Sequence, residues 1–182
     1  MNENELNFFK KMLWVVIILF VLRCIIGLPE TPYECLGHAS EAISVGLIMM
    51  AVYEKVLWKR NPLEKTPKIF GEYTATLEYE DNTGFHKKNI KIIIGQSLLS
   101  TSIKIVTNEI TSNSITSNLI RENGEYVLYY TYITNPKSRY SEENPIQYGT
   151  CRMTIRDNGL LAGNYWTIRK TKGDITCKRK VK

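Results

Sequence analysis

The chain has 182 residues, with 24 basic and 18 acidic side chains and a mean hydropathy of -0.21. This length has room for one domain of ordinary size together with an anchor. The four cysteines form no C-x-x-C pair and only two histidines could join them, which argues against a structural zinc site. Nothing in the cysteine pattern requires an oxidising compartment.

The net charge lies entirely in the second part of the chain. Residues 1–60 carry six basic and six acidic side chains, whereas residues 61–182 carry 18 basic and 12 acidic ones. A basic soluble domain favours anionic partners such as nucleotides, phosphates or lipid headgroups. A solvated basic face beside an anionic membrane leaflet explains the same charge equally well.

Residues 12–28 form the first of two apolar runs. The run is interrupted only by Arg23, and at about 1.5 Å per residue its helix just covers a hydrocarbon core of about 30 Å. A signal peptide has the same order of basic and then apolar residues. However, no small-x-small cleavage site follows, and a second apolar run begins shortly afterwards. A membrane span is therefore the favoured interpretation.

Residues 36–57 form the second, weaker run, whose most apolar part is 42–52. The two runs together predict a hairpin of two transmembrane helices within residues 1–60. Basic residues lie before the first run and after the second, whereas the connecting loop is acidic. Because positive residues favour the cytoplasmic side, both termini and the following domain are expected in the cytoplasm, where thiols stay reduced.

Three ionisable side chains share one face at the beginning of the second predicted helix. Glu34, His38 and Glu41 recur at helical spacing, and Arg23 lies near the same end of the first helix. Arg23 could therefore pair with Glu41 or Glu34, since ionisable groups at this depth usually face a partner or water. Simple snorkelling to the membrane interface explains these side chains too, and is slightly favoured.

After a linker at 61–68, the hydrophobic period changes from helical to alternating. In the first alternating segment, every second residue belongs to one mainly apolar face, and the residues between them are mostly Glu and Thr. That face consists of Ile69, Gly71, Tyr73, Ala75, Leu77 and Tyr79. The second strand is expected to end at 94. The six later strands are expected at 99–107, 111–121, 126–134, 147–156, 160–169 and 174–180. The polar stretch at 111–121 also fits a disordered segment.

Eight consecutive strands joined by short turns indicate a small up-and-down β-barrel of the lipocalin or streptavidin type. The predicted fold class is thus a membrane α-hairpin followed by an all-β domain, with an anchor at 1–60, a linker at 61–68 and a barrel at 69–182. A barrel of eight strands is either filled with side chains or holds one small ligand. The long loop at 135–144 is interpreted as a lid or as a mobile segment.

Aromatic, hydroxyl and arginine side chains occur on both faces of the later strands. Aromatic rings can stack on nucleobases, and arginine offers a fork of donors to phosphate. The candidate ligand-binding residues chosen on this chemistry are Tyr79, Tyr129, Thr131, Arg152, Thr167 and Arg169. Ordinary strand propensity also explains tyrosine and threonine here, and the inward and outward faces could be exchanged in these strands.

Gly71 and Tyr73 have a structural interpretation of their own. The first strand of small eight-stranded barrels often begins with Gly-x-aromatic, and an arginine from the last strand covers the ring. Arg179 or Arg169 could be that arginine. No nucleophile with a base, pair of carboxylates or Gly-rich phosphate loop is evident in the sequence. The chain is therefore expected to be no enzyme and to need neither metal nor cofactor.

Three short motifs accompany this architecture, W-K-R-x-P at 58–62, I-x-G-x-Y at 69–73 and G-N-Y-W-T-x-R at 163–169. Together with two short transmembrane helices, they resemble the two-transmembrane, β-strand-rich effectors of bacterial CBASS antiphage systems. By architecture, the resemblance covers nearly the whole chain.

The resemblance implies that the barrel binds a cyclic dinucleotide made by a partner nucleotidyltransferase. Binding would drive self-assembly in the inner membrane, membrane disruption and abortive infection. The implied partners are the cyclic dinucleotide, membrane lipids and further copies of the chain, with a functional link to the synthase, but not DNA or RNA. On chemical grounds Arg152 and Arg169 would hold the phosphates, Tyr79 and Tyr129 would stack on the bases, and Thr131 would read a polar group.

Two other functions fit the same architecture. A membrane-tethered lipid or fatty-acid carrier would use the barrel as an apolar cup with one or two interior arginines. An assembly module of an envelope complex would have a filled barrel without a cavity. The presence or absence of a cavity, and its polarity, therefore discriminate between the three.

Overall fold

The computed structural model describes residues 3–81, 84–142, 144–156 and 159–180. The chain divides into two compact units. The first comprises Met1–Thr66 with Ser97–Leu99, and the second Pro67–Gln96 with Ser100–Lys182. The boundary between residues 66 and 67 falls inside the linker expected at 61–68.

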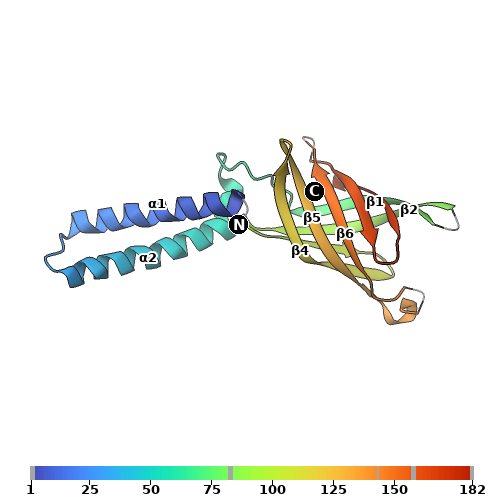
Figure 1. Ribbon diagram of the computed structural model, residues 1–182, viewed down its shortest axis with the longest axis horizontal. Helices are drawn as coiled ribbons and strands as arrows, with labels where there is room; N and C mark the ends of the chain where they lie inside the picture. The colour runs from blue at the N-terminus through green and yellow to red at the C-terminus, as the bar shows by residue number, and fades with distance from the viewer. Residues whose placement is uncertain (1–2, 82–83, 143, 157–158, 181–182) are drawn as a thin grey trace. The chain divides into compact units, whose positions relative to one another are not determined.

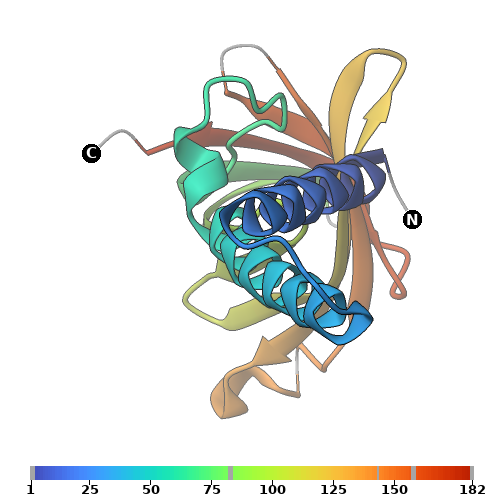
Figure 2. The same ribbon diagram turned by 90° about the vertical axis from the view of Figure 1, so that its left-hand side faces the viewer.

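The helical unit consists of α1 (Glu3–Ile26), α2 (Pro32–Lys55) and the short 3₁₀ helix η1 (Leu57–Arg60). Figure 1 and Figure 2 show α1 and α2 running antiparallel. Thr31 caps α2, because its hydroxyl accepts a hydrogen bond of 3.2 Å from the Glu34 amide, and Pro32 follows at the first helical position. The helices pack closely at Gly46, where a Cβ atom would lie 2.7 Å from Val16.

Among the described residues, α2 is the one helix that is long and apolar enough to cross a membrane. The helix α1 has the same length, but it contains Lys10, Lys11 and Arg23. The prediction of two membrane spans is therefore supported for α2 alone. Of the two interpretations of Arg23, the structure shows the pairing with Glu41 and not the slightly favoured snorkelling, since the Nε atom of Arg23 lies 2.7 Å from Oε2 of Glu41.

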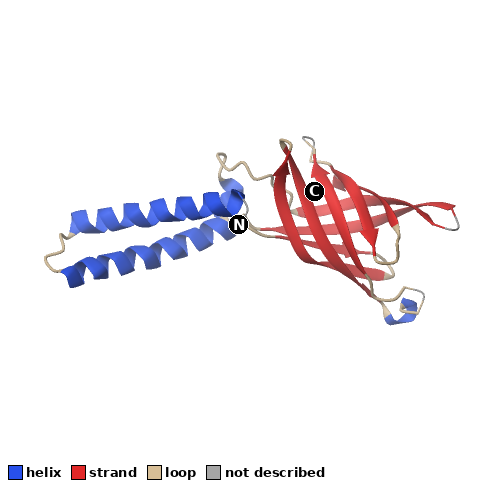
Figure 3. Ribbon diagram, in the orientation of Figure 1, coloured by secondary structure: helices blue, strands red, loops and turns tan. Residues whose placement is uncertain are grey.

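The second unit is a closed barrel of eight antiparallel strands, shown in Figure 3. Each strand pairs with the next, and β8 pairs back with β1. The strands are β1 (Gly71–Asp81), β2 (Gly84–Gln96), β3 (Thr101–Val106), β4 (Ile110–Glu122), β5 (Glu125–Pro136), β6 (Tyr148–Ile155), β7 (Leu161–Thr167) and β8 (Lys172–Arg179). The predicted up-and-down barrel is confirmed, and the polar stretch at 111–121 is part of a strand.

One end of the barrel is closed by the contact expected from the Gly71–Tyr73 motif. The guanidinium of Arg179 lies 5.7 Å from the ring centre of Tyr73 and 5.4 Å from that of Phe70, and it donates to the carbonyl oxygens of Lys68 and Phe70. Gly71 has a φ of 133°, a conformation that favours glycine. Arg179 is therefore the covering arginine, and Arg169 is not.

The core of the barrel fills this closed part with apolar side chains. Ile92 of β2, Leu128 of β5 and Met153 of β6 are fully buried there. Gly163 of β7 lies opposite Met153, and a Cβ atom at this position would lie 1.8 Å from the carbonyl oxygen of Arg152. Glycine in the 163–169 motif thus permits the close approach of β6 and β7.

Candidate ligand pocket of the barrel

The barrel holds a pocket of about 330 Å³ near the ends of β1 and β7. Leu77 and Tyr79, in the second half of β1, line it, so the pocket lies away from the end that Tyr73 and Arg179 close. Side chains of β1 to β5, β7 and β8 line it, together with the β3–β4 turn and the loop after β5. The barrel is therefore not completely filled, and the pocket has the size range of small-molecule sites.

Three polar atoms in the pocket wall are buried without a full set of partners. The hydroxyl of Tyr130 lies beside the weakly polar thiol of Cys151 and meets no other hydrogen-bond partner among the described residues. Within the same described part of the chain, Oε1 of Gln147 and Oγ1 of Thr167 are unpaired as well. Because buried polar atoms are rarely left unpaired, these three atoms point to a ligand with polar groups of its own.

Four tyrosines give the pocket an aromatic character, namely Tyr79, Tyr130, Tyr132 and Tyr165. The rings of Tyr79 and His86 stack with their centres 5.3 Å apart. Burial raises the pKa of Tyr165 to about 12 and raises the pKa values of Tyr130 and Tyr132 as well. These hydroxyls therefore stay protonated at neutral pH and can donate to a ligand.

Charged groups lie at two places in the pocket lining. Arg169 belongs to the turn between β7 and β8, which the 3.0 Å bond from the Lys170 amide to the Thr167 carbonyl closes. Lys88 of β2 faces Glu109 of the β3–β4 turn, with 3.0 Å between Nζ and Oε2. Two basic side chains and one carboxylate thus line the pocket among the residues that the structure describes.

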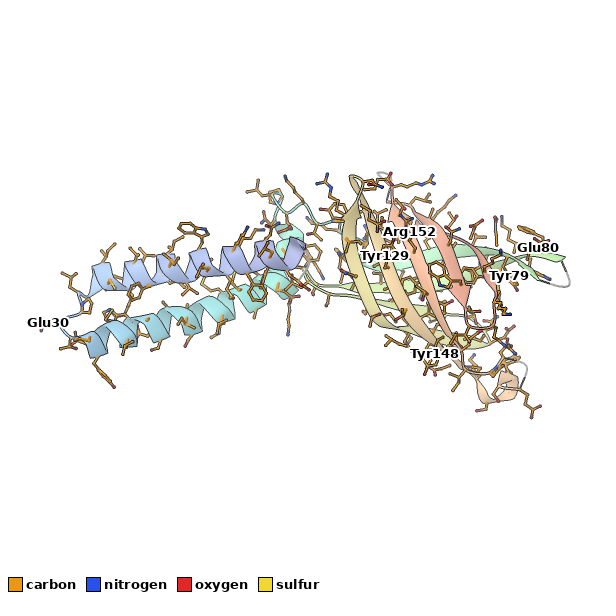
Figure 4. All side chains as sticks on the ribbon, viewed as in Figure 1. Glu30, Tyr79, Glu80, Tyr129, Tyr148 and Arg152 are labelled. Carbon is orange, nitrogen blue, oxygen red and sulfur yellow. The ribbon has the colours of Figure 1, made fainter. Side chains whose placement is uncertain are left out.

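The structure separates the six predicted site residues into two groups. Tyr79, Thr167 and Arg169 line the pocket. Tyr129, Thr131 and Arg152 do not, because β5 and β6 present them on the outer wall, where Figure 4 shows Tyr129 and Arg152 on neighbouring strands. The structure thus does not bring the six residues together in one pocket, and a role in ligand binding stays a prediction for all six.

The polar groups of these outer-wall residues form hydrogen bonds with other side chains of the wall. Arg152 donates from Nε to the Tyr129 hydroxyl at 2.8 Å and from Nη2 to Glu122 at 2.9 Å. These hydrogen bonds from Arg152 and Tyr129 lower the pKa of the Glu122 carboxyl. Thr131 pairs with Thr116 across the β4–β5 ladder, with 2.7 Å between the hydroxyl oxygens. The side-chain groups that suggested a phosphate site here are therefore already paired with other side chains of the barrel wall.

Several pocket residues were not recognised from the sequence. Lys88 could have been found, since it lies two residues before Ile90 and so continues the inward row of β2. Tyr130 and Tyr132 are on the alternative face of β5, which the sequence pattern left open. Glu109 lies in a connection, where no periodicity indicates direction, and Gln147, predicted as the first residue of a strand, lies just before β6.

Two comparisons with known proteins bear on this pocket. The family described as "Cap15, cyclic dinucleotide receptor domain" matches residues 64–179, which include nearly the whole barrel. The chain is also 35% identical over 182 residues to CD-NTase-associated protein 15 of Staphylococcus schleiferi, covering 98% of this chain and 99% of that protein. The matched domain is thus described as a receptor. The chain therefore belongs to the Cap15 family of CBASS effectors, whose barrel is a cyclic dinucleotide receptor domain.

Proposed function

We propose that this chain senses a cyclic dinucleotide in the barrel pocket and passes the signal to the membrane as self-assembly. The observation that carries the proposal is the group of buried, unpaired polar atoms of Tyr130, Gln147 and Thr167 in a basic, aromatic pocket. An apolar lipid tail would leave these atoms unpaired, whereas nucleobase edges and ribose hydroxyls offer partners. The membership of the receptor family supports the same ligand class.

The lining suggests a role for each group. Arg169 at the pocket rim and Lys88 in the wall are the basic side chains for two phosphates. Tyr79 offers an aromatic face to one base, in addition to its stack on His86. The hydroxyls of Tyr130 and Thr167 read polar base or sugar groups. This assignment replaces Arg152 and Tyr129 by Lys88 and Tyr130.

The second part of the proposal is a hairpin with two membrane spans. Large apolar side chains are exposed along the length of α1, on the part of its surface that does not pack against α2, which is costly in water and favourable in lipid. They are Leu6, Phe9, Leu13, Trp14, Ile17, Ile18, Val21, Leu22, Ile25 and Ile26. With Lys10 and Lys11 in the first half of α1, before its most apolar part, and Lys59 and Arg60 after α2, both termini and the barrel lie on the cytoplasmic side of the bacterial inner membrane.

The third part concerns the output. A ligand drives assembly only if it binds the assembled state more tightly than the single chain. The anchor confines the barrels to two dimensions and raises their effective concentration, so that a modest preference is sufficient. Assembled hairpins then disrupt the membrane and end the infection of the cell, in response to a nucleotide made by the partner synthase.

The test is a thermal-shift measurement on the full chain in detergent against a panel of cyclic di- and trinucleotides. A ligand at one hundred times its dissociation constant adds about 2.7 kcal/mol to the free energy of unfolding. We expect Arg169→Ala to weaken binding by at least about tenfold, since a hydrogen-bonded charge pair is lost. The matched control is Arg152→Ala, on the outer wall, which we expect to bind as the wild type does.

Two results would contradict the proposal. If Arg152→Ala abolished binding and Arg169→Ala did not, the ligand would bind on the outer wall. If no nucleotide shifted the melting temperature and lipid co-purified with the chain, the carrier function would be favoured instead.

A further inference from the structure

The barrel wall is open beside β2, at the height of the pocket. The β1–β2 ladder continues to Asp81 and Gly84, and Figure 1 shows this hairpin projecting from the barrel. The β2–β3 ladder, however, begins only at Lys91 and Val106. The preceding part of β2 therefore faces the β3–β4 turn at 107–109 without backbone pairing between them.

A second hollow, of about 490 Å³, lies at this opening, and residues such as Glu72 and Lys91 on the outward face of the barrel line it. It shares four lining residues with the inner pocket, and these form the partition between the two. They are Lys88, Ile90, Thr107 and Glu109. The side-chain bond that crosses the partition is the ion pair of Lys88 and Glu109, at 3.0 Å.

Glu109 has an unfavourable position for a receptor of anions. It contributes the one carboxylate to the pocket lining within the described part of the chain, and it pairs with a basic side chain that faces the same pocket. A ligand phosphate near Lys88 would be repelled by this carboxylate, and would compete with it for the same ammonium group.

The backbone of Glu109 also connects the pocket to the long loop after β5. Its carbonyl oxygen accepts a 2.9 Å hydrogen bond from the Lys137 amide, and Nζ of Lys137 lies 2.6 Å from the carbonyl oxygen of Asn108. Lys137 directly follows β5 and begins the loop whose later residues Asn144 and Gln147 line the pocket. A movement of the 107–109 turn would therefore be transmitted to this loop.

We infer that Glu109 is a built-in substitute for the ligand phosphate, which holds Lys88 and closes the side opening in the empty receptor and is displaced when the ligand binds. This inference rests on the proposed function, because it specifies how the same pocket is regulated. The ion pair keeps the turn and the loop in the empty arrangement. A phosphate that takes over Lys88 frees Glu109 and, with it, the two hydrogen bonds that the amide and the ammonium group of Lys137 donate to the 107–109 turn.

The test compares Glu109→Gln with a matched control, Glu78→Gln. Glu78 pairs with Lys87 at 2.7 Å on the outer wall, and its side chain is 39% exposed against 36% for Glu109. Both substitutions remove one negative charge from a similarly exposed ion pair. Binding of cyclic di-GMP, cyclic di-AMP and cyclic GMP–AMP to the full chain in detergent is measured by calorimetry.

We expect Glu109→Gln to bind the best of these nucleotides about tenfold more tightly than the wild type, because a competing charge is removed. Glu78→Gln should stay close to the wild type, and Lys88→Gln should bind at least about tenfold more weakly. Equal or weaker binding by Glu109→Gln, with an unchanged control, would overturn the inference.

A second readout needs no ligand and separates this inference from the proposed function. If Glu109 holds the turn, the amides of residues 107–110 exchange hydrogen faster in Glu109→Gln than in Glu78→Gln. Unchanged exchange would refute the holding role even if no nucleotide bound. Absence of nucleotide binding by all variants would instead count against the proposed function, whatever the exchange result.

Discussion

At the scale of single residues, Arg179 shows how one side chain decides which end of the barrel is available. Its guanidinium lies against Phe70 and Tyr73 and donates to two backbone carbonyls, so it covers the end of the core. We expect Arg179→Ala to lower the free energy of unfolding by about 1–2 kcal/mol, since a stacked and hydrogen-bonded arginine is lost. Thermal unfolding of the full chain in detergent measures this change.

The neighbouring Lys178 provides the control for Arg179, because its side chain is exposed on the outer face. Lys178→Ala should change the free energy of unfolding by no more than about 0.5 kcal/mol. Arg179→Lys should restore only part of the loss, since an ammonium group lacks the planar fork. Equal stability of Arg179→Ala and Lys178→Ala would show that the covering contact contributes nothing.

At the scale of elements, the ion pair of Arg23 and Glu41 links α1 to α2. Within a bilayer, removing one partner leaves the other charge unpaired, at a cost of about 3 kcal/mol on helix-insertion scales. We therefore expect Arg23→Ala to reduce the fraction of chain retained in the membrane after alkaline extraction. The exchanged variant, with Arg23→Glu and Glu41→Arg together, should restore retention. Failure of this exchange to restore it would mean that the pair is not what holds the helices.

At the scale of the whole barrel, two buried thiols make stability depend on pH. Burial raises the pKa values of Cys151 and Cys177 from 9.0 to about 12. Below about pH 8 both thiols are protonated in the folded and unfolded states, so they add almost no pH dependence. Above it the unfolded chain loses protons that the folded barrel keeps. Stability should therefore fall by up to about 1.4 kcal/mol per pH unit for each thiol.

Unfolding measured between pH 7.5 and about pH 9.5 tests this expectation, because most tyrosines of the unfolded chain stay protonated in that range. The wild type should be stable to the same degree up to about pH 8 and then lose stability. The double variant with Cys151→Ala and Cys177→Ala should be less stable throughout, because cavities are created, but its curve should be flatter. Identical slopes in the two proteins would show that the thiols do not cause the loss.

The architecture of the barrel could be predicted because its determinants are local. The alternation from Ile69 to Tyr79 and the turn at 122–124 each depend on a few neighbouring residues, and short turns between successive strands leave little choice of pairing. The same reasoning placed Arg179 or Arg169 over Tyr73. It did not choose between them, because both belong to the last part of the chain and their directions depend on how the barrel closes.

The pocket was predicted only in part, because the two faces of each later strand carry similar kinds of residue. On β5 the rows through Tyr129 and Tyr130 both contain tyrosines, so that burial could not be assigned by period. Register with β6 places Tyr129 opposite Arg152 and Tyr130 opposite Cys151, and closure of the barrel turns the second row inward. Arg152 was selected for its chemistry, but Glu122 supplies its counter-charge on the outer wall.

The sequence by itself determined the apolar N-terminal part, the eight strands and the resemblance to CBASS effectors, since periodicity, turn residues and short motifs are properties of adjacent residues. Only the tertiary structure decided which face of each later strand points inward, which arginine closes the barrel, and that Lys88 meets Glu109. These features join residues from different strands. They depend on register and closure, which the whole sheet sets together.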